Sequence, residues 1–439
     1  MTNFRLSNLR IIAPFSQPEF IEKGWIDISN GMIESIGHAK TPPSPDVQCI
    51  DMGGKTVLPG MINAHTHLYS SLAMGMPPPS VKPVNFTEIL QRIWWKLDRG
   101  LDADSVLASF QVGLLQAIKS GVTTVIDHHS SPNFIDGSTH RLVDTAGAFG
   151  IRVATAFEIS DRNGYLTFTR ALDENLTAVH DFASKENVHP MIGIHASFTL
   201  SDTSLSTIRS ALKNLSGTGI HIHVAEDKSD EDHACSLGYE SVIKRLHHFD
   251  LLTDRSLIIH GIHLKRADAD LLAEISASLV HCPTSNANNR VGSLSTEVIL
   301  QLSAGLGTDG MQANLVKEAK TGSSIRSASH HGSGKSVNYI ELLYRNNPVI
   351  AGQLFQQKIG KIESGYPADL AFYDYHPFTE ITSGNWSAHL LSGMDEPSDV
   401  MTRGIFRVKD HQFKFGNEAE IRSHARLASR RLWDNMMRV

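Results

Sequence analysis

Cysteine is scarce in this chain of 439 residues, and its few thiols are poorly placed for cross-linking. Cys49, Cys235 and Cys282 are odd in number and far apart in the sequence. This pattern argues against a disulfide framework and against a cysteine-rich zinc site, and it is typical of a reducing compartment. The first residues also lack the charged stretch and apolar run of a signal peptide. We therefore expect a cytoplasmic protein.

The sequence also has no excess of positive charge and no long apolar run. The formal net charge is -6, which argues against a basic surface for nucleic acid. No stretch approaches the roughly 18 uninterrupted apolar residues of a membrane-spanning helix. A Pro-Cys-x-x-Cys motif with His-x-Glu is missing, as is His-Glu-x-x-His, which excludes cytidine-type zinc deaminases and one class of metalloprotease. We expect neither nucleic acid nor membrane as a partner.

Both ends of the chain have the alternating pattern of short β-strands. The segment "WIDISNGMIESIGHA" contains two alternating runs joined by Asn30-Gly31, which is a strong hairpin signal because both residues tolerate positive φ. Near the other end, "ADLAFYDY" and "VMTRGIFRVKDHQF" have similar patterns, and a helix is predicted after Asn417. We expect residues 1–57 and 358–439 to form one small β-sandwich domain with this C-terminal helix.

The middle of the chain, residues 58–357, alternates between short apolar runs and helical patterns. Repeated strand–helix units of this length predict a parallel sheet, and eight of them predict a (β/α)8 TIM-like barrel, so the fold class is α/β. The predicted strands cover residues 57–65, 122–128, 151–157, 191–195, 219–223, 256–260, 277–281 and 304–309.

Histidines and carboxylates follow the predicted strands at their C-terminal ends. Those ends meet at one face of a barrel, where active sites lie. In the segment "PGMINAHTH", His65 and His67 are two residues apart, so their side chains point the same way along a strand and can bind one metal ion. A single pair is weak evidence, but the joint pattern predicts a metal site. The pattern of histidines and carboxylates at the strand ends comprises His65 and His67, Asp127 to His129, Glu158, His195, His221 and His223, His260, His281 and Asp309.

One long insertion, residues 68–100, follows the first predicted barrel strand. It contains the stiff segment "GMPPPSVKP" and the paired tryptophans of "WWKLDRGLD". Two interpretations stay open: a lid over the mouth of the barrel, or a packed surface loop.

With these motifs, the sequence resembles the amidohydrolase superfamily, and within it the branch of heterocyclic-amine deaminases and triazine chlorohydrolases. The resemblance spans nearly the whole chain. It is most similar to the aminohydrolases called SsnA, through "WWKLDRGLD", "AIKSGVTTVIDHHSSP" and "FEISDRNG". The matching branch motifs are "PGMINAHTH", "HIHVAE", "IIHGIHL", "HCPTSN", "GLGTDG" and "GYPADLAFYD".

The resemblance implies one divalent metal ion held by side chains from three strands. Such ligands suit Zn²⁺, with Fe²⁺ as the alternative. Some branches of the superfamily hold two metals with a modified lysine on the fourth strand. Here that strand ends in "GIHASF" without lysine, so one metal is expected. The implied ligands are His65, His67, His223 and Asp309.

The resemblance also implies the catalytic groups. A metal-bound water would attack an amine-bearing ring carbon, with Asp309 and His260 accepting its proton. Glu226, three residues after His223, would protonate a ring nitrogen and then help ammonia leave; its alternative is a solvated loop carboxylate. His195 is expected to contact the substrate. Two weaker candidates for the substrate site, each with an ordinary packing role as the alternative, are His128 and Trp95.

The leading hypothesis from these residues is hydrolytic deamination of an aminopurine, a pterin or a related ring. A second hypothesis keeps the site but removes a halide or an alkylamine from a triazine-like ring, or opens a cyclic amide. A third is a catalytically silent barrel that acts as a binding partner; a broken site would be its mark, and here every site position is filled. The family resemblance also implies a homodimer or a larger homo-oligomer.

Overall fold

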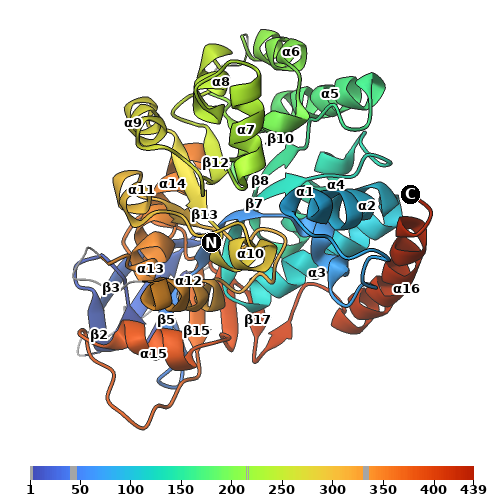
Figure 1. The fold of residues 1–439 in the computed structure, drawn as a ribbon. Coiled ribbons are helices and arrows are strands. Elements are labelled where there is room, and N and C mark those ends of the chain that lie inside the picture. The colour runs from blue at the N-terminus through green and yellow to red at the C-terminus, as the bar shows by residue number, and fades with distance from the viewer. Residues whose placement is uncertain (1–2, 40–46, 214, 216, 330–335) are drawn as a thin grey trace.

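The eight predicted barrel strands all form, as parallel strands with their C-terminal ends on one side (Figure 1). This computed structural model describes residues 3–39, 47–213, 215, 217–329 and 336–439. The barrel strands are β6 Met61–Thr66, β7 Val122–His129, β8 Arg152–Phe157, β10 Ile192–Ala196, β11 Ile220–Val224, β12 Leu257–His260, β13 Ser278–His281 and β14 Gly305–Leu306. A short strand, β9 (Val188–Pro190), leads into β10.

The strands close into a ring through two single-residue bridges. One sheet runs β6-β7-β8-β9 and the other β10-β11-β12-β13-β14. The bridges Thr66–Asp309 and Ile159–Ile194 join them at both sides. The predicted (β/α)8 barrel is thereby confirmed.

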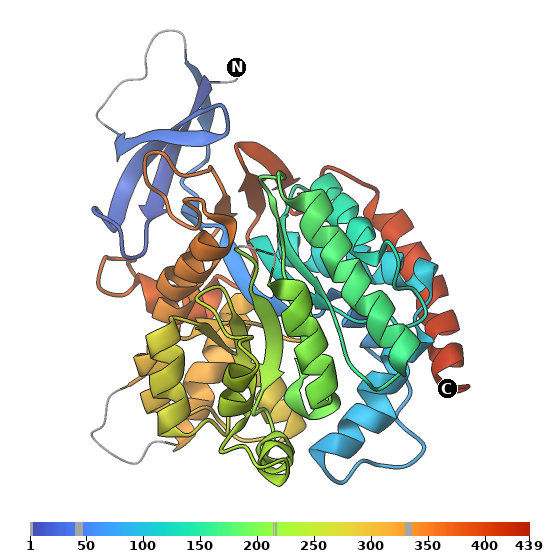
Figure 2. The same cartoon turned by 90° about the horizontal axis from the view of Figure 1, so that it is seen from above.

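Helices follow the strands and surround the ring (Figure 2). They cover the outer faces of the strands, which explains why β7 is buried over its whole length. The helices outside the ring are α3 Ala103–Lys119, α4 Ser138–Phe149, α5 Tyr165–Phe182, α6 Asp202–Leu212, α7 Lys228–Ser236, α8 Val242–His248, α9 Arg266–Ile275, α10 Pro283–Asn289, α11 Thr296–Gln301, α12 Leu315–Ser329, α13 Tyr339–Glu341 and α14 Asn347–Phe355.

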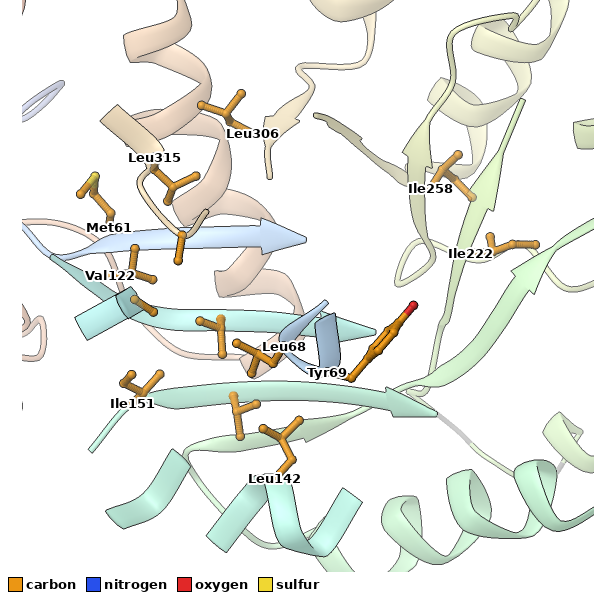
Figure 3. Close-up of a cluster of buried hydrophobic side chains, with 14 of the residues drawn as sticks. Met61, Leu68, Tyr69, Val122, Leu142, Ile151, Ile222, Ile258, Leu306 and Leu315 are labelled. Atoms are coloured by element: carbon orange, nitrogen blue, oxygen red, sulfur yellow. The ribbon is translucent and has the colours of Figure 1, made fainter. Parts of the chain in front are cut away.

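Apolar side chains fill the space around the strands and leave their C-terminal ends to polar residues. Met61, Val122 and Ile151 lie at the starts of the first three strands, and all three are buried (Figure 3). Tyr69 lies near the C-terminal ends of the same strands (Figure 3). The chemistry-bearing side chains therefore stand on a packed, rigid base.

The prediction of one continuous strand over residues 57–65 is wrong, because this segment contains parts of two strands. β5 (Thr56–Pro59) pairs with strands of the terminal sheet, whereas Met61 begins β6 in the barrel. The break falls at Pro59-Gly60, where a Cβ on Gly60 would lie 2.4 Å from the side chain of Thr123. Only glycine lets the chain pass this closely from one sheet to the other.

In the part of the chain that the structure describes, the two ends share one sheet of nine strands. Its order is β18-β17-β16-β15-β5-β1-β2-β3, with β4 beside β1. The Asn30-Gly31 hairpin forms as predicted, between β2 and β3. The sheet confirms an extra β-domain from both termini; the limits at residues 57 and 358 stay a prediction. Its strands are β1 Asn3–Ile12, β2 Phe20–Ser29, β3 Met32–His38, β4 Gln48–Asp51, β5, β15 Leu370–Tyr373, β16 Asp399–Thr402, β17 Ile405–Lys409 and β18 Gln412–Phe413.

The C-terminal helix, α16 (Glu418–Met436), supports the insertion that follows β6. It begins after Asn417, whose side chain accepts hydrogen bonds from the first turn, as predicted. It packs against α3 and against α2 (Trp95–Gly100), which is part of the insertion. The indole of Trp433 donates to the Leu72 carbonyl oxygen at 3.0 Å. In the part of the chain that the structure describes, no helix is long and apolar enough to cross a membrane.

Candidate active site

Four of the predicted ligands converge at the C-terminal end of the barrel. His65, His67, His223 and Asp309 each offer one ligand atom, and these atoms all lie within 4.8 Å of one another. Nε2 of His67 is 3.1 Å from Nε2 of His223 and 3.0 Å from Oδ1 of Asp309. Three imidazole nitrogens and one carboxylate oxygen in such a group fit a borderline divalent ion such as zinc.

The second ring nitrogen of each histidine is already occupied. Nδ1 of His67 lies 2.6 Å from the carbonyl oxygen of His128, and Nδ1 of His223 lies 2.7 Å from that of His195. Because a carbonyl oxygen only accepts, both Nδ1 atoms carry a proton, and Nε2 is the atom of each ring that faces the group and can bind a metal ion. Nε2 of His65 is buried, and no described residue hydrogen-bonds it. These residues therefore fit a metal ion.

The electrostatics of this group also favour a cation. Burial lowers the pKa of His65 to about 3, because a charged ring would lose its hydration. Burial acts in the same direction on His67, but the hydrogen bond and charge of Asp309 outweigh it and raise the pKa of His67 to about 9. A proton therefore collects beside Asp309, at the place where a divalent ion would displace it.

Asp309 and His260 project over the barrel mouth from left-handed backbone. Their φ values are 55° and 72°, which is rare for residues other than glycine and is found at functional sites. Oδ1 of Asp309 accepts from the Gly310 amide at 2.7 Å, and Oδ2 accepts from the Ser285 hydroxyl. Nε2 of His260 lies 3.8 Å from Oδ2 of Asp309.

Glu226 and His260 form the second half of the site. Oε2 of Glu226 is 3.4 Å from Nε2 of His260, and its Oε1 accepts from the Asn289 amide at 3.1 Å. Nδ1 of His260 is 2.8 Å from the amide oxygen of Asn286. Burial raises the pKa of Glu226, although His260 and Asn289 oppose this. A carboxyl group whose pKa is raised by burial suits general acid catalysis better than an ordinary exposed carboxylate.

A cavity of about 750 Å³, counting space open to solvent, lies above these groups. The insertion that follows β6 supplies part of its wall, through Tyr69, Phe86, Leu90, Trp94 and Trp95. The insertion therefore forms part of the cavity wall at the barrel mouth.

The three predicted substrate residues differ in where they lie. His195 and Trp95 both line the cavity, with ring centroids 6.1 Å apart. His128 is fully buried below it, with Nε2 3.2 Å from the Ile194 carbonyl oxygen, and it is not among the lining residues. The structure does not bring His128 into the cavity, because its side chain points into the barrel interior.

A buried ion-pair cluster that the sequence analysis did not anticipate stands in the cavity wall. Arg162 pairs with Glu158 and with Asp98, the latter at 3.0 Å, and its guanidinium lies 4.7 Å from the Trp95 ring centre. Paired with Arg162, Glu158 has a pKa lowered to about 2, although burial alone would raise it. The cluster gives the wall a fixed charge and a fixed shape.

Sequence reasoning also missed three polar residues on α10 that hold the catalytic candidates. Ser285 contacts Asp309, Asn286 contacts His260 and Asn289 contacts Glu226. The segment "HCPTSN" was a signal for two of them, since it directly follows the seventh strand. Their partners lie on other strands, so the spacing within the sequence gave no pairing.

The barrel and the group of three histidines and one aspartate define a metal-binding hydrolase fold. The chain matches the model of the amidohydrolase family over residues 56–405, and it belongs to that family. The predicted family and the predicted enzyme class, a hydrolase of this family, are confirmed.

Curated relatives with similar sequences are deaminases. The 5-methylthioadenosine/S-adenosylhomocysteine deaminase of Caldanaerobacter subterraneus subsp. tengcongensis is 26% identical over 420 residues, which is 93% of each chain. The enzyme of the same name from Thermoanaerobacter pseudethanolicus is 27% identical over 384 residues, which is 85% of each chain.

Solved structures share the fold at lower identity. An adenosine deaminase from Xanthomonas campestris with bound zinc has a TM-score of 0.83 at 19% identity, with 98% of each chain covered. Atrazine chlorohydrolase from Arthrobacter aurescens TC1, complexed with zinc, has a TM-score of 0.82 at 18% identity, covering 97% of this chain and all of that one. Guanine deaminase of E. coli has a TM-score of 0.77 at 17% identity, covering 93% of this chain and 99% of that one.

Proposed function

We propose that the chain is a metal-dependent aminohydrolase that removes an amino group from a heterocyclic ring as ammonia. The single observation that carries this proposal is the position of Glu226. Its carboxyl group lines the cavity beside His260, next to the candidate ligand group, with a pKa raised by burial. Such a group can donate a proton to a ring nitrogen and then to a leaving amine. The deaminase relatives support the same chemistry.

The proposed ligands of the metal are His65, His67, His223 and Asp309, and Zn²⁺ is the proposed ion, with Fe²⁺ as the alternative. When bound, such an ion orients a water, lowers its pKa and polarises the group under attack. The zinc in the two neighbouring structures supports this choice.

The side chains around this group have separate proposed roles. His260 and Asp309 accept the proton of the attacking water. Nε2 of His260 and Oδ2 of Asp309 are 3.8 Å apart, so both can reach one water. Asn286 holds His260 in one orientation through its amide oxygen. His195 and Trp95 bind the ring from the wall of the cavity. The two rings stand at 68° to each other, so one can stack on a flat heterocycle while the other meets its edge.

The charged groups around the cavity limit the classes of substrate that it can bind. Among the described residues, its lining contains no lysine or arginine. Its acidic residues are Asp98 and Glu158, both paired with Arg162, Glu226 and Asp230, whose pKa values are raised by burial, and Asp227 and Asp309. Because unlike charges attract and like charges repel in a partly buried site, we expect a neutral or cationic ring compound. Anionic substituents should weaken binding.

The proposal is tested by ammonia release from a panel of rings. The zinc-loaded chain is incubated with aminopurines, their nucleosides, pterins, aminopyrimidines and amino-, alkylamino- or chlorotriazines, and ammonia, alkylamine and chloride are all measured. Ammonia from one ring class with Glu226 intact supports the proposal. Chloride or alkylamine release without ammonia would replace it with the triazine-type reaction.

A silent panel has two different meanings. With one metal ion bound per chain, silence would contradict the proposed leaving group for these rings. Failure to bind any metal would favour the silent barrel. The homo-oligomer, the cytoplasmic location and the SsnA group stay predictions.

A further inference from the structure

The fifth barrel strand carries a second histidine, His221, which has no role in the chemistry above. It stands two residues before His223, so both side chains point into the barrel. His221 is fully buried, and its Nε2 lies 2.8 Å from Nδ1 of His65. The strands β6 and β11 thus carry matching His-x-His motifs. The upper pair is His67 with His223, and the lower pair is His65 with His221.

This contact differs from those of the other two histidine ligands. The Nδ1 atoms of His67 and His223 face carbonyl oxygens, which fix the proton on Nδ1. Nδ1 of His65 faces another imidazole, and an imidazole nitrogen can either donate or accept. Among the described residues, Nδ1 of His65 makes no other hydrogen bond.

The direction of this hydrogen bond decides whether His65 can bind a metal. If Nδ1 of His65 donates, its Nε2 keeps a free lone pair. If Nδ1 accepts, the single proton of the neutral ring sits on Nε2, the atom 3.6 Å from Oδ1 of Asp309. A protonated Nε2 cannot bind a metal ion. The metal-binding form of His65 therefore requires an acceptor at His221.

We propose that His221 is a positioning residue that accepts the Nδ1 proton of His65 and holds Nε2 of His65 free for the metal. This inference rests on the proposed function, because it needs the metal site of that proposal. It extends that proposal to a residue outside the cavity, since His221 is not among the lining residues. A partner of this kind typically changes metal affinity by about 10- to 100-fold when it is removed.

The experiment measures zinc affinity, by competition with a chelator, for the full-length chain and four variants. His221→Phe keeps a ring but removes the acceptor. His221→Gln replaces the ring with a side chain whose amide oxygen can still reach Nδ1 of His65. The side chain of His221→Asn is shorter, so its amide oxygen does not reach that atom. The matched control is His129→Phe, another fully buried imidazole on β7, which hydrogen-bonds Ser131 and packs against Phe110.

We expect the Phe and Asn variants to bind zinc about 10- to 100-fold more weakly, and the Gln and control variants to stay near the wild type. The absorption spectrum of bound Co²⁺ should change in the same order, because it reports the ligand geometry. Wild-type affinity in the Asn variant, or equal weakening in Gln and Asn, would overturn the inference. The Gln and Asn pair decides the question even if the Phe variant does not fold.

Failure of the metal site itself is visible separately. His65→Ala must lose tight zinc binding if the proposed ligand set holds. If His65→Ala binds zinc as the wild type does, the ligand set is wrong and the role of His221 falls with it. If His65→Ala loses zinc while every His221 variant keeps it, only the role of His221 is wrong.

Discussion

Oε2 of Glu226 lies 3.4 Å from Nε2 of His260, although the two residues belong to different strand ends of the barrel. The strands that carry them, β11 and β12, are neighbours, with Val224 paired to His260. Glu226 follows two residues after the end of β11, and the left-handed backbone of Ala225 turns the chain there. The fold thus places an acid and a base side by side in one cavity.

Glu226→Gln should separate catalysis from metal binding. The amide keeps the shape of the side chain but has no proton to give to a ring nitrogen. We expect kcat to fall by about 10²- to 10⁴-fold, the usual contribution of a general acid, with the zinc content unchanged. Ammonia release and zinc per chain are measured on the same sample. Glu231→Gln, a nearby buried carboxylate outside the cavity lining, is the control. An active Glu226→Gln enzyme would remove the acid role.

Asn289→Ala should move the pH dependence of the reaction. The Asn289 amide donates to Glu226 and stabilises its charged form, which lowers the pKa of Glu226 against the effect of burial. Without this donor, the pKa of Glu226 rises further. A general acid works when it is protonated, so activity is lost as pH increases through its pKa. The basic limb of kcat/KM against pH should therefore move to higher pH.

The control for this shift is Thr207→Ala, an exposed residue of α6 whose hydroxyl donates to the Thr203 carbonyl oxygen in its own helix. It should leave the basic limb where the wild type has it. If the limb of Asn289→Ala stays in place or moves to lower pH, Glu226 is not the group that titrates there.

His65→Ala and Asp309→Ala should each abolish tight zinc binding. Each removes one of four donors from a group whose ligand atoms lie within 4.8 Å of one another. Removing Asp309 also removes the only carboxylate of the four and so the main charge that attracts the cation. Zinc per chain after dialysis is the measurement. Full retention in either variant would contradict the ligand assignment.

Much of the fold and of the ligand group could be predicted from local patterns. Residues at i and i+2 of a strand share a face, and parallel strands bring their C-terminal ends together, so His65, His67 and His223 could be grouped without a structure. Local patterns do not show how far a side chain lies below the floor of the cavity. His128 stands at a strand end like the others, but its side chain is fully buried among its neighbours.

Pairings between distant segments could not be predicted for a related reason. The hydrogen bond of Asn286 to His260 spans 26 residues, and that of Asn289 to Glu226 spans 63. The spacing of apolar residues and the residue types in turns describe one segment at a time. They therefore do not determine which helix end contacts which strand end. The same holds for the pairing that gives Thr56–Pro59 to the terminal sheet.

Gly307→Ala should weaken zinc binding by displacing the backbone of His65. A Cβ on Gly307 would lie 2.8 Å from the carbonyl oxygen of His65 and 2.9 Å from its Cβ, so the backbone of β6 would have to move. Overpacking of this kind costs about 1–3 kcal/mol, and here the displaced residue is a proposed ligand. We expect a lower free energy of unfolding together with weaker zinc binding, measured by denaturant titration and chelator competition.

Gly147→Ala separates the effect of position from the effect of the methyl group. Gly147 lies in α4, and a Cβ there meets no atom within 4 Å. Alanine loses less backbone freedom than glycine in a helix, so this change should stabilise the fold by about 0.5–1 kcal/mol and leave zinc affinity unaltered. Weaker zinc binding confined to Gly307→Ala ties the loss to the close approach of β14 and β6. Equal zinc affinity in both variants would mean that His65 can still bind the metal after the backbone moves. The contact with Gly307 would then not determine the position of His65.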